Sequence, residues 1–336
     1  MGTTIKDIAK KANVSVSTVS RALNNKGYIS KKTKKKIIRI ADSLSYKPNY
    51  IAQSLQSGVS NTICLLIPNI QGLVFPDIAQ GVEDVARENG YTVVLCNSND
   101  NAETERKYID LMLKRQIDGF VICSAKKGEA NVFYMIENDI PCTIVNRYRK
   151  EFLNKVDCVG IDNRQALEDA VNYLYKRGYR KFAFAKGDQD LSFNYERYHG
   201  FLSALKKLNL ELNSDWIMEK ANDDFYKETI ELMSSEEKPD CIIASTDQKA
   251  FYILSALNDL KMKIPEEVGL LGFDNLSMSE IIKPSLSTVY QPLYEYGRVA
   301  CMSVLKQIEH KKEYGKLPKP RKHIMDYKIV ARKTTR

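Results

Sequence analysis

The sequence predicts a small all-α head followed by a larger α/β body made of two doubly wound parallel sheets. Apolar residues recur at helical spacing over the first 60 residues, and from Thr62 onward short apolar runs of strand length alternate with amphipathic segments. Charge divides the chain at the same place. Residues 1–60 contain twelve Lys and Arg against two Asp, whereas the rest carries 39 basic against 40 acidic residues. A basic head on a neutral body is typical of a protein that binds nucleic acid.

Length and composition limit the classes of protein to consider. With 336 residues, 43% of them hydrophobic, the chain can bury a large core and form two or three domains. The seven cysteines stand singly, most of them inside apolar runs, which predicts buried free thiols in a reducing compartment and no metal site or cofactor. Because no apolar region follows the first residues and no membrane-length apolar run occurs, we expect a cytoplasmic protein.

The first two helices are predicted as a helix-turn-helix. Asn13-Val14 interrupts the first apolar pattern, and Ser15 is a suitable N-cap for the second helix. The first helix carries Ile5, Ile8, Ala9 and Ala12, and the second carries Val16, Val19, Ala22 and Leu23. In this arrangement the outer face of the second helix would meet the DNA major groove through Val16, Ser17, Ser20 and Arg21.

A third helix and a short hinge complete the head. Ser30 is the expected N-cap of the third helix, and the lysines at 31, 32 and 34–36 suit contact with phosphates. Beyond Pro48, Asn49 could cap a helix of about two turns over 50–56, which Gly58 would end. So short a helix is unstable alone, and we expect it to be poorly ordered in the free protein and to form on DNA.

These motifs together resemble the LacI/GalR family of bacterial transcription regulators. The family spacing is present in Ile5-Lys6-Asp7-Ile8-Ala9, Val14-Ser15, Thr18-Val19-Ser20-Arg21, Leu23-Asn24, Tyr46-Lys47-Pro48-Asn49 and Ala52-Gln53-Ser54-Leu55. An ordinary helical hairpin is the alternative for the first motif alone, and the hinge and charge evidence disfavours it. The resemblance implies a set of DNA-contacting residues: Thr4, Ser15, Val16, Ser17, Thr18, Ser20, Arg21, Asn24, Tyr28, Lys31, Asn49, Ala52 and Leu55. Leu55 would be an apolar wedge in the minor groove.

The body is predicted as two β-α-β series of similar size. In the first series we expect strands at 63–67, 91–96, 119–123 and 142–145, with helices near 76–89, 102–116 and 129–138. The second series has strands at 181–185, 240–244 and 268–272, with helices near 164–177, 195–208, 225–235 and 247–261. Two such series imply two parallel-sheet lobes. The periplasmic sugar-binding proteins have this two-lobed fold.

The C-terminal region is predicted as a long helix from about 293 to 312 and a strand at 323–330. The resemblance implies that the chain crosses back between the lobes here. The expected domains are a head at 1–47, a hinge at 48–60, a first lobe at 61–161 with 292–322, and a second lobe at 162–291 with 323–336. No leucine heptad follows the last strand, so we expect a homodimer, with a higher oligomer as the open alternative.

Ligands of parallel sheets bind at the carboxyl ends of strands, and two lobes form a cleft there. The resemblance implies effector contacts at Leu73, Phe75, Asn146, Arg197, Phe225, Thr246, Asp247, Asp274 and Gln291. Each has a simpler alternative: a surface arginine for Arg197, a turn aspartate for Asp274, and core packing for the two phenylalanines. Asn146 stands where the lactose repressor has an aspartate, and Thr246 where it has an asparagine, so we expect a ligand other than the same galactoside.

The motifs of the main enzyme classes are absent. The sequence contains no G-x-G-x-x-G, P-loop, H-E-x-x-H or G-x-S-x-G, and its three histidines are far apart. We therefore predict a ligand-controlled, sequence-specific regulator, a repressor of a carbohydrate uptake or catabolic operon, whose partners are a palindromic operator, a sugar or sugar phosphate, and a second copy of the chain. The alternatives are a periplasmic-type sugar-binding protein without a DNA role and an α/β enzyme. The sequence leaves open the identity of the effector, the sign of its action, the operator and any protein partner.

Overall fold

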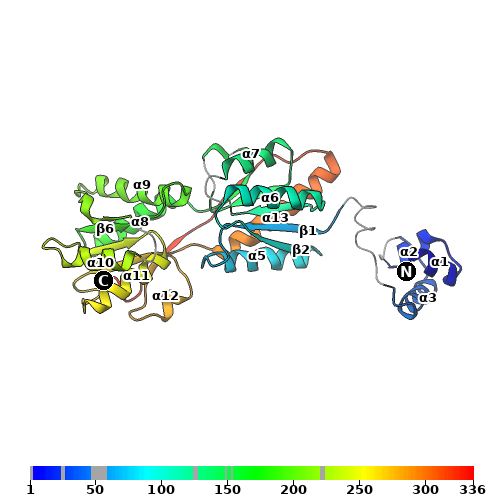
Figure 1. The fold of residues 1–336 in the computed structure, drawn as a ribbon, viewed down its shortest axis with the longest axis horizontal. Coiled ribbons are helices and arrows are strands. Elements are labelled where there is room, and N and C mark those ends of the chain that lie inside the picture. Colours follow the sequence, from blue (N-terminus) through cyan, green and yellow to red (C-terminus); the bar gives the residue numbers. More distant parts are fainter. Residues whose placement is uncertain are drawn as a thin grey trace. The chain divides into compact units, whose positions relative to one another are not determined.

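The computed structural model describes residues 3–23, 27–46, 59–123, 128–147, 150–152, 154–219 and 224–336. The chain divides into two compact units, a head (Met1–Ser60) and a body (Asn61–Arg336) (Figure 1). None of the helices in the described ranges is long and apolar enough to cross a membrane.

The head is the predicted bundle of three helices, α1 (Ile5–Ala12), α2 (Val16–Leu23) and α3 (Lys31–Ser43). Both predicted caps are confirmed: the Ser15 hydroxyl accepts a hydrogen bond from the Thr18 N–H at 3.1 Å, and the Ser30 hydroxyl accepts one from the Thr33 N–H at 3.1 Å. The three helices bury one shared core of Ile8, Ala9, Ala12, Val19, Ala22, Ile37 and Ala41. The expected hinge helix at 50–56 lies outside the described residues.

The first lobe is a sheet of six parallel strands in the order β11-β5-β4-β3-β1-β2. Its strands are β1 (Thr62–Ile67), β2 (Thr92–Asn97), β3 (Gly119–Ile122), β4 (Cys142–Val145), β5 (Asp157–Gly160) and β11 (Lys322–Ile324). Helices α5 (Phe75–Glu88) and α13 (Leu293–Tyr314) cover one face, and α6 (Ala102–Lys114) and α7 (Glu129–Glu137) cover the other (Figure 1). Strand β1 is buried on both faces, which explains its unbroken apolar run.

The second lobe repeats this plan in the order β12-β10-β9-β8-β6-β7. Its strands are β6 (Phe182–Ala185), β7 (Ile217–Met218), β8 (Cys241–Ala244), β9 (Gly269–Asp274), β10 (Ser287–Tyr290) and β12 (Lys328–Val330). Its helices are α8 (Asn163–Lys176), α9 (Ser192–Lys207), α10 (Phe225–Ser234), α11 (Asp247–Asp259) and α12 (Met278–Ile281). Short 3₁₀ turns lie at Lys150–Phe152 and Ser214–Trp216. One strand, β12, runs antiparallel to its neighbour β10, so this sheet is mostly rather than wholly parallel.

One sequence prediction about the tail is wrong. The segment 323–330 is not a single strand of the second lobe, because Ile324 pairs with Gly160 in the first sheet and Val330 pairs with Thr288 in the second. The chain crosses between the lobes at residues 325–327, so His323 and Ile324 belong to the first lobe. The apolar pattern could not reveal this, since two short edge strands with a crossing between them read as one continuous strand. Strands β5, β7 and β10 were also not predicted.

Helices α5 and α13 approach closely because each has a glycine at the contact. A β-carbon on Gly81 would lie 2.1 Å from the Tyr294 carbonyl oxygen, and one on Gly297 would lie 2.0 Å from the Ile78 carbonyl oxygen. A side chain at either position would force the helices apart. The start of α13 is thereby fixed against the first lobe.

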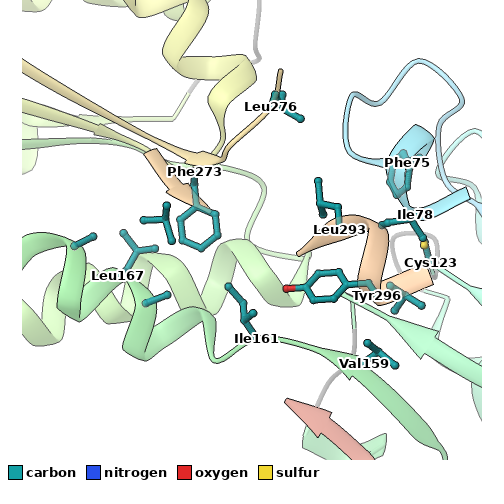
Figure 2. Close-up of a cluster of buried hydrophobic side chains, with 14 of the residues drawn as sticks. Phe75, Ile78, Cys123, Val159, Ile161, Leu167, Phe273, Leu276, Leu293 and Tyr296 are labelled. Atoms are coloured by element: carbon teal, nitrogen blue, oxygen red, sulfur yellow. The ribbon is translucent and has the colours of Figure 1, made fainter. Parts of the chain in front are cut away.

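A hydrophobic cluster continues from one lobe into the other. Figure 2 shows Leu293 and Tyr296, at the start of α13, between Phe75 of the first lobe and Phe273 of the second. The three connections between the lobes, at 161–162, 291–292 and 325–327, each contain or adjoin a residue of this cluster or one packed against it. The seven cysteines are free and buried, as predicted, and burial raises the pKa of Cys123 to about 12.

Candidate functional site

The exposed face of α2 carries the side chains that the sequence assigned to DNA. Val16 is 41% exposed although it is apolar, and Ser17 and Arg21 are exposed beside it. The opposite face, with Val19 and Ala22, is buried against the other two helices. The helix therefore presents one apolar, one hydroxyl and one guanidinium group to the solvent, and such groups can contact base edges in a major groove.

Hydroxyl groups order the start of this helix. The Ser15 hydroxyl lies 2.8 Å from that of Ser17 and 2.8 Å from that of Thr18. Thr4 begins α1 in the same way, since its N–H and its hydroxyl both donate to the Asp7 carboxylate at 2.8 and 2.7 Å. The hydrogen bond from the Thr4 hydroxyl, followed by the bond from its N–H, lowers the pKa of Asp7.

The other head residues that were predicted to contact DNA differ in their surroundings. Tyr28 is 98% exposed and Lys31 is exposed at the start of α3, so both side chains are accessible to a phosphate backbone. Lys36 differs from the other lysines of α3, because its Nζ donates to the Ala12 carbonyl at 2.8 Å and stabilises the end of α1. It is therefore engaged within the head. Four predicted contact residues lie outside the described residues: Asn24, Asn49, Ala52 and Leu55.

In the body, Arg197 lies at the centre of a polar site and is not the surface arginine of the simpler alternative. Its side chain is 1% exposed, its Nε donates to Asn163 Oδ1 at 2.9 Å, and its Nη1 donates to the Ser245 carbonyl at 2.6 Å. The guanidinium carbon lies 3.5 Å from the ring centroid of Phe273 and 4.9 Å from that of Phe193. Burial lowers the pKa of Arg197 to about 10, so the group stays charged at neutral pH.

Asp274 faces Arg197 from the end of β9. The Asp274 Oδ1 lies 3.6 Å from Arg197 Nη1, which is too long for a direct hydrogen bond, and it accepts one from Gln291 Nε2 at 2.6 Å. Tyr296 donates in turn to Gln291 Oε1 at 3.2 Å. Burial raises the pKa of Asp274 to about 7 against the opposing effect of Arg197. The residue has a φ of 126°, a strained value for a residue with a side chain and one that is typical of functional sites.

Several buried polar atoms of Arg197 and of other residues of the body lack a hydrogen-bond partner among the described residues. They are Arg197 Nη2, Asn146 Oδ1, Ser192 Oγ, Asn194 Oδ1 and Ser245 Oγ. Leaving such an atom unpaired costs about 1–3 kcal/mol. These atoms can accept hydrogen bonds from a bound group or donate them to it.

A cavity of about 560 Å³ opens beside these groups and is lined from both lobes. Asn146 and Lys322 contribute from the first lobe, and Asn163, Ser192 and Phe193 contribute from the second. Arg197 and Asp274 do not line the cavity themselves. Arg197 adjoins it through Asn163 and Phe193, the residues that it contacts.

One arginine of the first lobe lies near aromatic rings of both lobes. Arg147, which follows β4, forms an ion pair with Asp100 at 2.7 Å within the first lobe. Its guanidinium carbon also lies 5.9 Å from the ring centroid of Phe75 and 5.8 Å from that of Phe193 in the second lobe. A change in the separation of the lobes would therefore alter this contact.

The other sequence-predicted effector residues have different surroundings. Leu73 is 43% exposed, Phe75 is buried at the start of α5, and Phe225 is fully buried in a core cluster of the second lobe. The Thr246 hydroxyl caps α11, where it accepts from the Lys249 N–H at 3.4 Å. For both phenylalanines the structure agrees with core packing.

Asp247 is fully buried, and within the second lobe its carboxylate accepts three hydrogen bonds. The donors are the Leu276 N–H at 2.9 Å, the Ser279 hydroxyl at 2.6 Å and the Thr288 hydroxyl at 2.6 Å. Burial raises the pKa of this carboxyl. The carboxylate ties α11 to the segment after β9 and to β10.

Sequence reasoning missed several residues of this site, namely Asn163, Ser192, Phe193 and Ser245. Ser245 directly follows a predicted strand, so it could have been found by inspecting every strand end. Asn163 directly precedes a predicted helix. Nothing in the pattern distinguished Phe193 from a core residue.

Comparison with known proteins places both units. Residues 4–49 match the profile described as "Bacterial regulatory proteins, lacI family", and residues 60–333 match "Periplasmic binding proteins and sugar binding domain of LacI family". A ribose operon repressor of Halalkalibacterium halodurans is 34% identical over 316 residues, which cover 92% of this chain and 91% of that protein.

Two solved structures extend the comparison. A periplasmic binding protein/LacI transcriptional regulator from Alkaliphilus metalliredigens, complexed with D-xylulofuranose, is 28% identical with a TM-score of 0.69 and covers 82% of this chain and 99% of its own. The lac repressor dimer bound to operator and the anti-inducer ONPF has a TM-score of 0.87 over 100% of this chain and 99% of its own. At 19% identity, the second likeness concerns the fold alone.

Proposed function

The chain belongs to the LacI family of bacterial regulatory proteins, and from this premise we propose that it represses a carbohydrate uptake or catabolic operon in response to a sugar-type effector. Members of this family are ligand-controlled DNA-binding transcription regulators and not enzymes, and this chain is one of them. The proposal concerns the class of genes, the effector and the residues that bind it.

The DNA-binding part of the proposal depends on the exposed face of α2. Val16, Ser17 and Arg21 would contact base edges, and Tyr28 and Lys31 would contact phosphates. The rest of the sequence-derived set, including Leu55 as a wedge in the minor groove, is proposed from the family motif alone. Two copies of a head that reads one half-site would select a palindromic operator, so the functional unit would be a homodimer.

The effector part is carried by one observation: in the described part of the chain, buried polar atoms of Arg197 and Ser245, and of Asn146 and Ser192 beside the cavity that both lobes line, have no hydrogen-bond partner. A ligand with several hydroxyl groups can satisfy both a guanidinium and a carboxylate, since each hydroxyl both donates and accepts. The relative named as a ribose operon repressor and the relative complexed with D-xylulofuranose support a carbohydrate. We place the protein in the cytoplasm, where operator DNA and imported sugars meet.

The proposed domains are a head at 1–47, a hinge at 48–60 and two lobes with three crossings between them. The pairing of β11 with β5 and of β12 with β10 supports a last crossing at 325–327, with β11 in the first lobe and β12 in the second.

Selection of bound sequences from random DNA, followed by titration of the winning duplex, tests the function. The full chain should select a site with two-fold symmetry, and adding a sugar of the right class should change its affinity for that site. Recovery of no symmetric consensus would refute the operator proposal. A symmetric consensus whose binding no sugar or sugar phosphate alters would refute the effector proposal and leave the first intact.

A further inference from the structure

The segment 311–322, which joins α13 to β11, concentrates positive charge on a body that is otherwise acidic. Six of the 39 basic residues of the body and one of its 40 acidic residues fall within this basic segment, so the remainder has 33 basic against 39 acidic residues. Two of the six are engaged elsewhere, since the Lys311 Nζ donates to the Asp139 carbonyl at 2.6 Å and Lys322 lines the cavity. The other four side chains are exposed, and no carboxylate of the described residues forms an ion pair with them: Lys312, Lys316, Lys319 and Arg321.

Hydrogen bonds hold the basic segment in place at both ends. Gly315 ends α13 with a φ of 73°, and its N–H donates to a carbonyl of the last helical turn at 2.8 Å. The Nδ1 of His310 lies 2.8 Å from the Lys316 carbonyl oxygen. Before β11, the Arg321 N–H donates to the Asp157 carboxylate at 2.7 Å. A loop that is already ordered loses little conformational entropy when it binds a partner.

The basic segment begins at the end of the first lobe from which the chain continues into the head. Strand β1 starts at that end, and its Ile63 pairs with Gly119 at the start of β3. Helix α13 packs on the same glycine, because a β-carbon on Gly119 would lie 2.5 Å from Val304 and 3.4 Å from Ile308. From Ile308 the helix continues to Tyr314, a further rise of about 9 Å. Figure 1 shows the end of α13 and the start of β1 at the same end of this lobe.

The neighbouring loops do not offset this positive charge. Those that precede β3, β4 and β5 lie at the same end of the sheet, and they carry two basic and three acidic residues: Arg115, Lys155, Asp118, Asp139 and Asp157. Of the three acids only Asp139 is exposed, whereas both basic side chains are exposed. The exposed charge at this end of the lobe is therefore positive.

Covalent connection keeps this end of the body near any DNA that the head has bound. The proposed hinge, 48–60, spans at most about 45 Å when its thirteen residues are fully extended. Phosphates repel carboxylates, so an acidic surface tethered this close to DNA would oppose binding. A positive surface at the tethered end attracts the phosphates instead, and the short tether raises its effective concentration beside them.

We propose that Lys312, Lys316, Lys319 and Arg321 of the basic segment form a second DNA-binding surface, which contacts the phosphate backbone of the duplex that the head binds. The inference rests on the proposed operator binding and adds to it a contact made by the body. Phosphate contacts carry no sequence information, so this surface would strengthen binding to operator and to random duplex by a similar factor. Base preference would remain a property of the head.

The salt dependence of DNA binding by the full chain tests the inference. The basic-segment variant is Lys312→Gln/Lys316→Gln/Lys319→Gln, and a dimer of it loses up to six phosphate contacts, each of which contributes about 0.9 to the slope of log K against log salt. We expect the slope to become shallower by at least about two. Binding to the selected operator should weaken at least about tenfold at 50 mM salt and by a smaller factor at 200 mM, and random duplex should show the same pattern.

A matched variant controls for the change in net charge. Lys206→Gln/Lys227→Gln/Lys263→Gln removes three exposed lysines from the second lobe. It should leave both the salt slope and the operator affinity at their wild-type values. The midpoint of thermal unfolding should be unchanged in both triple variants, because none of these six side chains forms an ion pair with the described residues.

A crosslinking measurement reports proximity directly and does not depend on the triple variants. Lys316→Cys, labelled with a photoactivated crosslinker, should form an adduct with operator duplex, and Lys206→Cys labelled in the same way should not. The seven natural cysteines are buried, so the introduced thiol is the one that is readily labelled.

Three results would overturn the inference: an unchanged salt slope in the basic-segment variant, an equal change in both triple variants, or no adduct from Lys316→Cys under conditions in which the head is bound. The proposed function would stand in each case as long as the wild type selects a symmetric site that responds to a sugar. If the wild type selects no symmetric site, the operator proposal fails. The salt slopes and adducts on random duplex then decide this inference separately.

Discussion

Replacing Arg197 should uncouple the effector from DNA binding while leaving the head intact. In Arg197→Ala the ligand loses the hydrogen bond from Nη2. A charge-assisted hydrogen bond contributes about 1.5–3 kcal/mol, so the dissociation constant of the ligand should rise roughly 10- to 150-fold. The head shares no core residue with this site among the described residues. Operator affinity without ligand should therefore equal that of the wild type, and the effect of the ligand, typically about 1–3 kcal/mol, should disappear at the wild-type working concentration.

The same substitution also affects the fold of the second lobe. Asn163 Oδ1 and the Ser245 carbonyl lose their donor, and Asp274 loses its nearest cation, so the free energy of unfolding should fall by up to about 3–5 kcal/mol. Arg197→Lys separates the two effects, because it keeps the charge but cannot donate to Asn163, Ser245 and a ligand at once. Its stability should exceed that of Arg197→Ala, yet its ligand affinity should still be lowered.

The assay is a fluorescence titration of operator duplex with and without ligand, for wild type, both variants and Arg177→Ala. Arg177 is an exposed arginine of the same lobe that stacks on Tyr173, and its loss should not change the response. A wild-type ligand response in Arg197→Ala would refute the assignment of the site. An equal loss of operator affinity with and without ligand would show that Arg197 acts through the fold and not through the ligand.

Three further predictions concern the head, the protonation of the site and the packing of the body. Arg21→Ala should cost about 1–3 kcal/mol and relax the preference at one base position, whereas Lys31→Ala should weaken all sequences alike and reduce the salt slope by about one, as measured by binding at several salt concentrations. Because burial raises the pKa of Asp274 to about 7, the carboxyl is protonated below that pH, and calorimetric ligand affinity should fall by up to about tenfold per pH unit from 6.5 to 5, a dependence that Asp274→Asn should lack. The pKa of Asp274 is also raised above its ordinary value of 3.8, so this carboxyl stabilises the ligand-free fold at pH 4 and loses that contribution as the pH rises to about 7. Gly297→Ala should lower the free energy of unfolding by about 1–3 kcal/mol, because its β-carbon would lie 2.0 Å from a carbonyl oxygen of α5, and Met302→Ala on the exposed side of the same helix is the control; wild-type thermal stability in Gly297→Ala would contradict the close helix contact.

The sequence alone determined the class of the protein because its evidence there is local. Ser15 and Ser30 begin helices for a reason contained within three residues, and the spacings Ile8 to Ala12 in the first helix and Val19 to Ala22 in the second follow from the helical repeat. The alternating series of the body depends in the same way on runs such as β1, whose apolar residues are buried on both faces. Basic charge in the head required no structure to be recognised.

Only the tertiary structure decided how the tail crosses and which polar groups meet. Ile324 and Val330 are six residues apart yet pair with different sheets, a choice made by strands β5 and β10 far away in the sequence. Arg197 reads as an ordinary surface arginine until the fold buries it beside Asn163 and Asp274, which come from other elements. Burial and the balance of charge depend on groups that are brought together from distant positions, and a pattern along one strand or helix does not contain them.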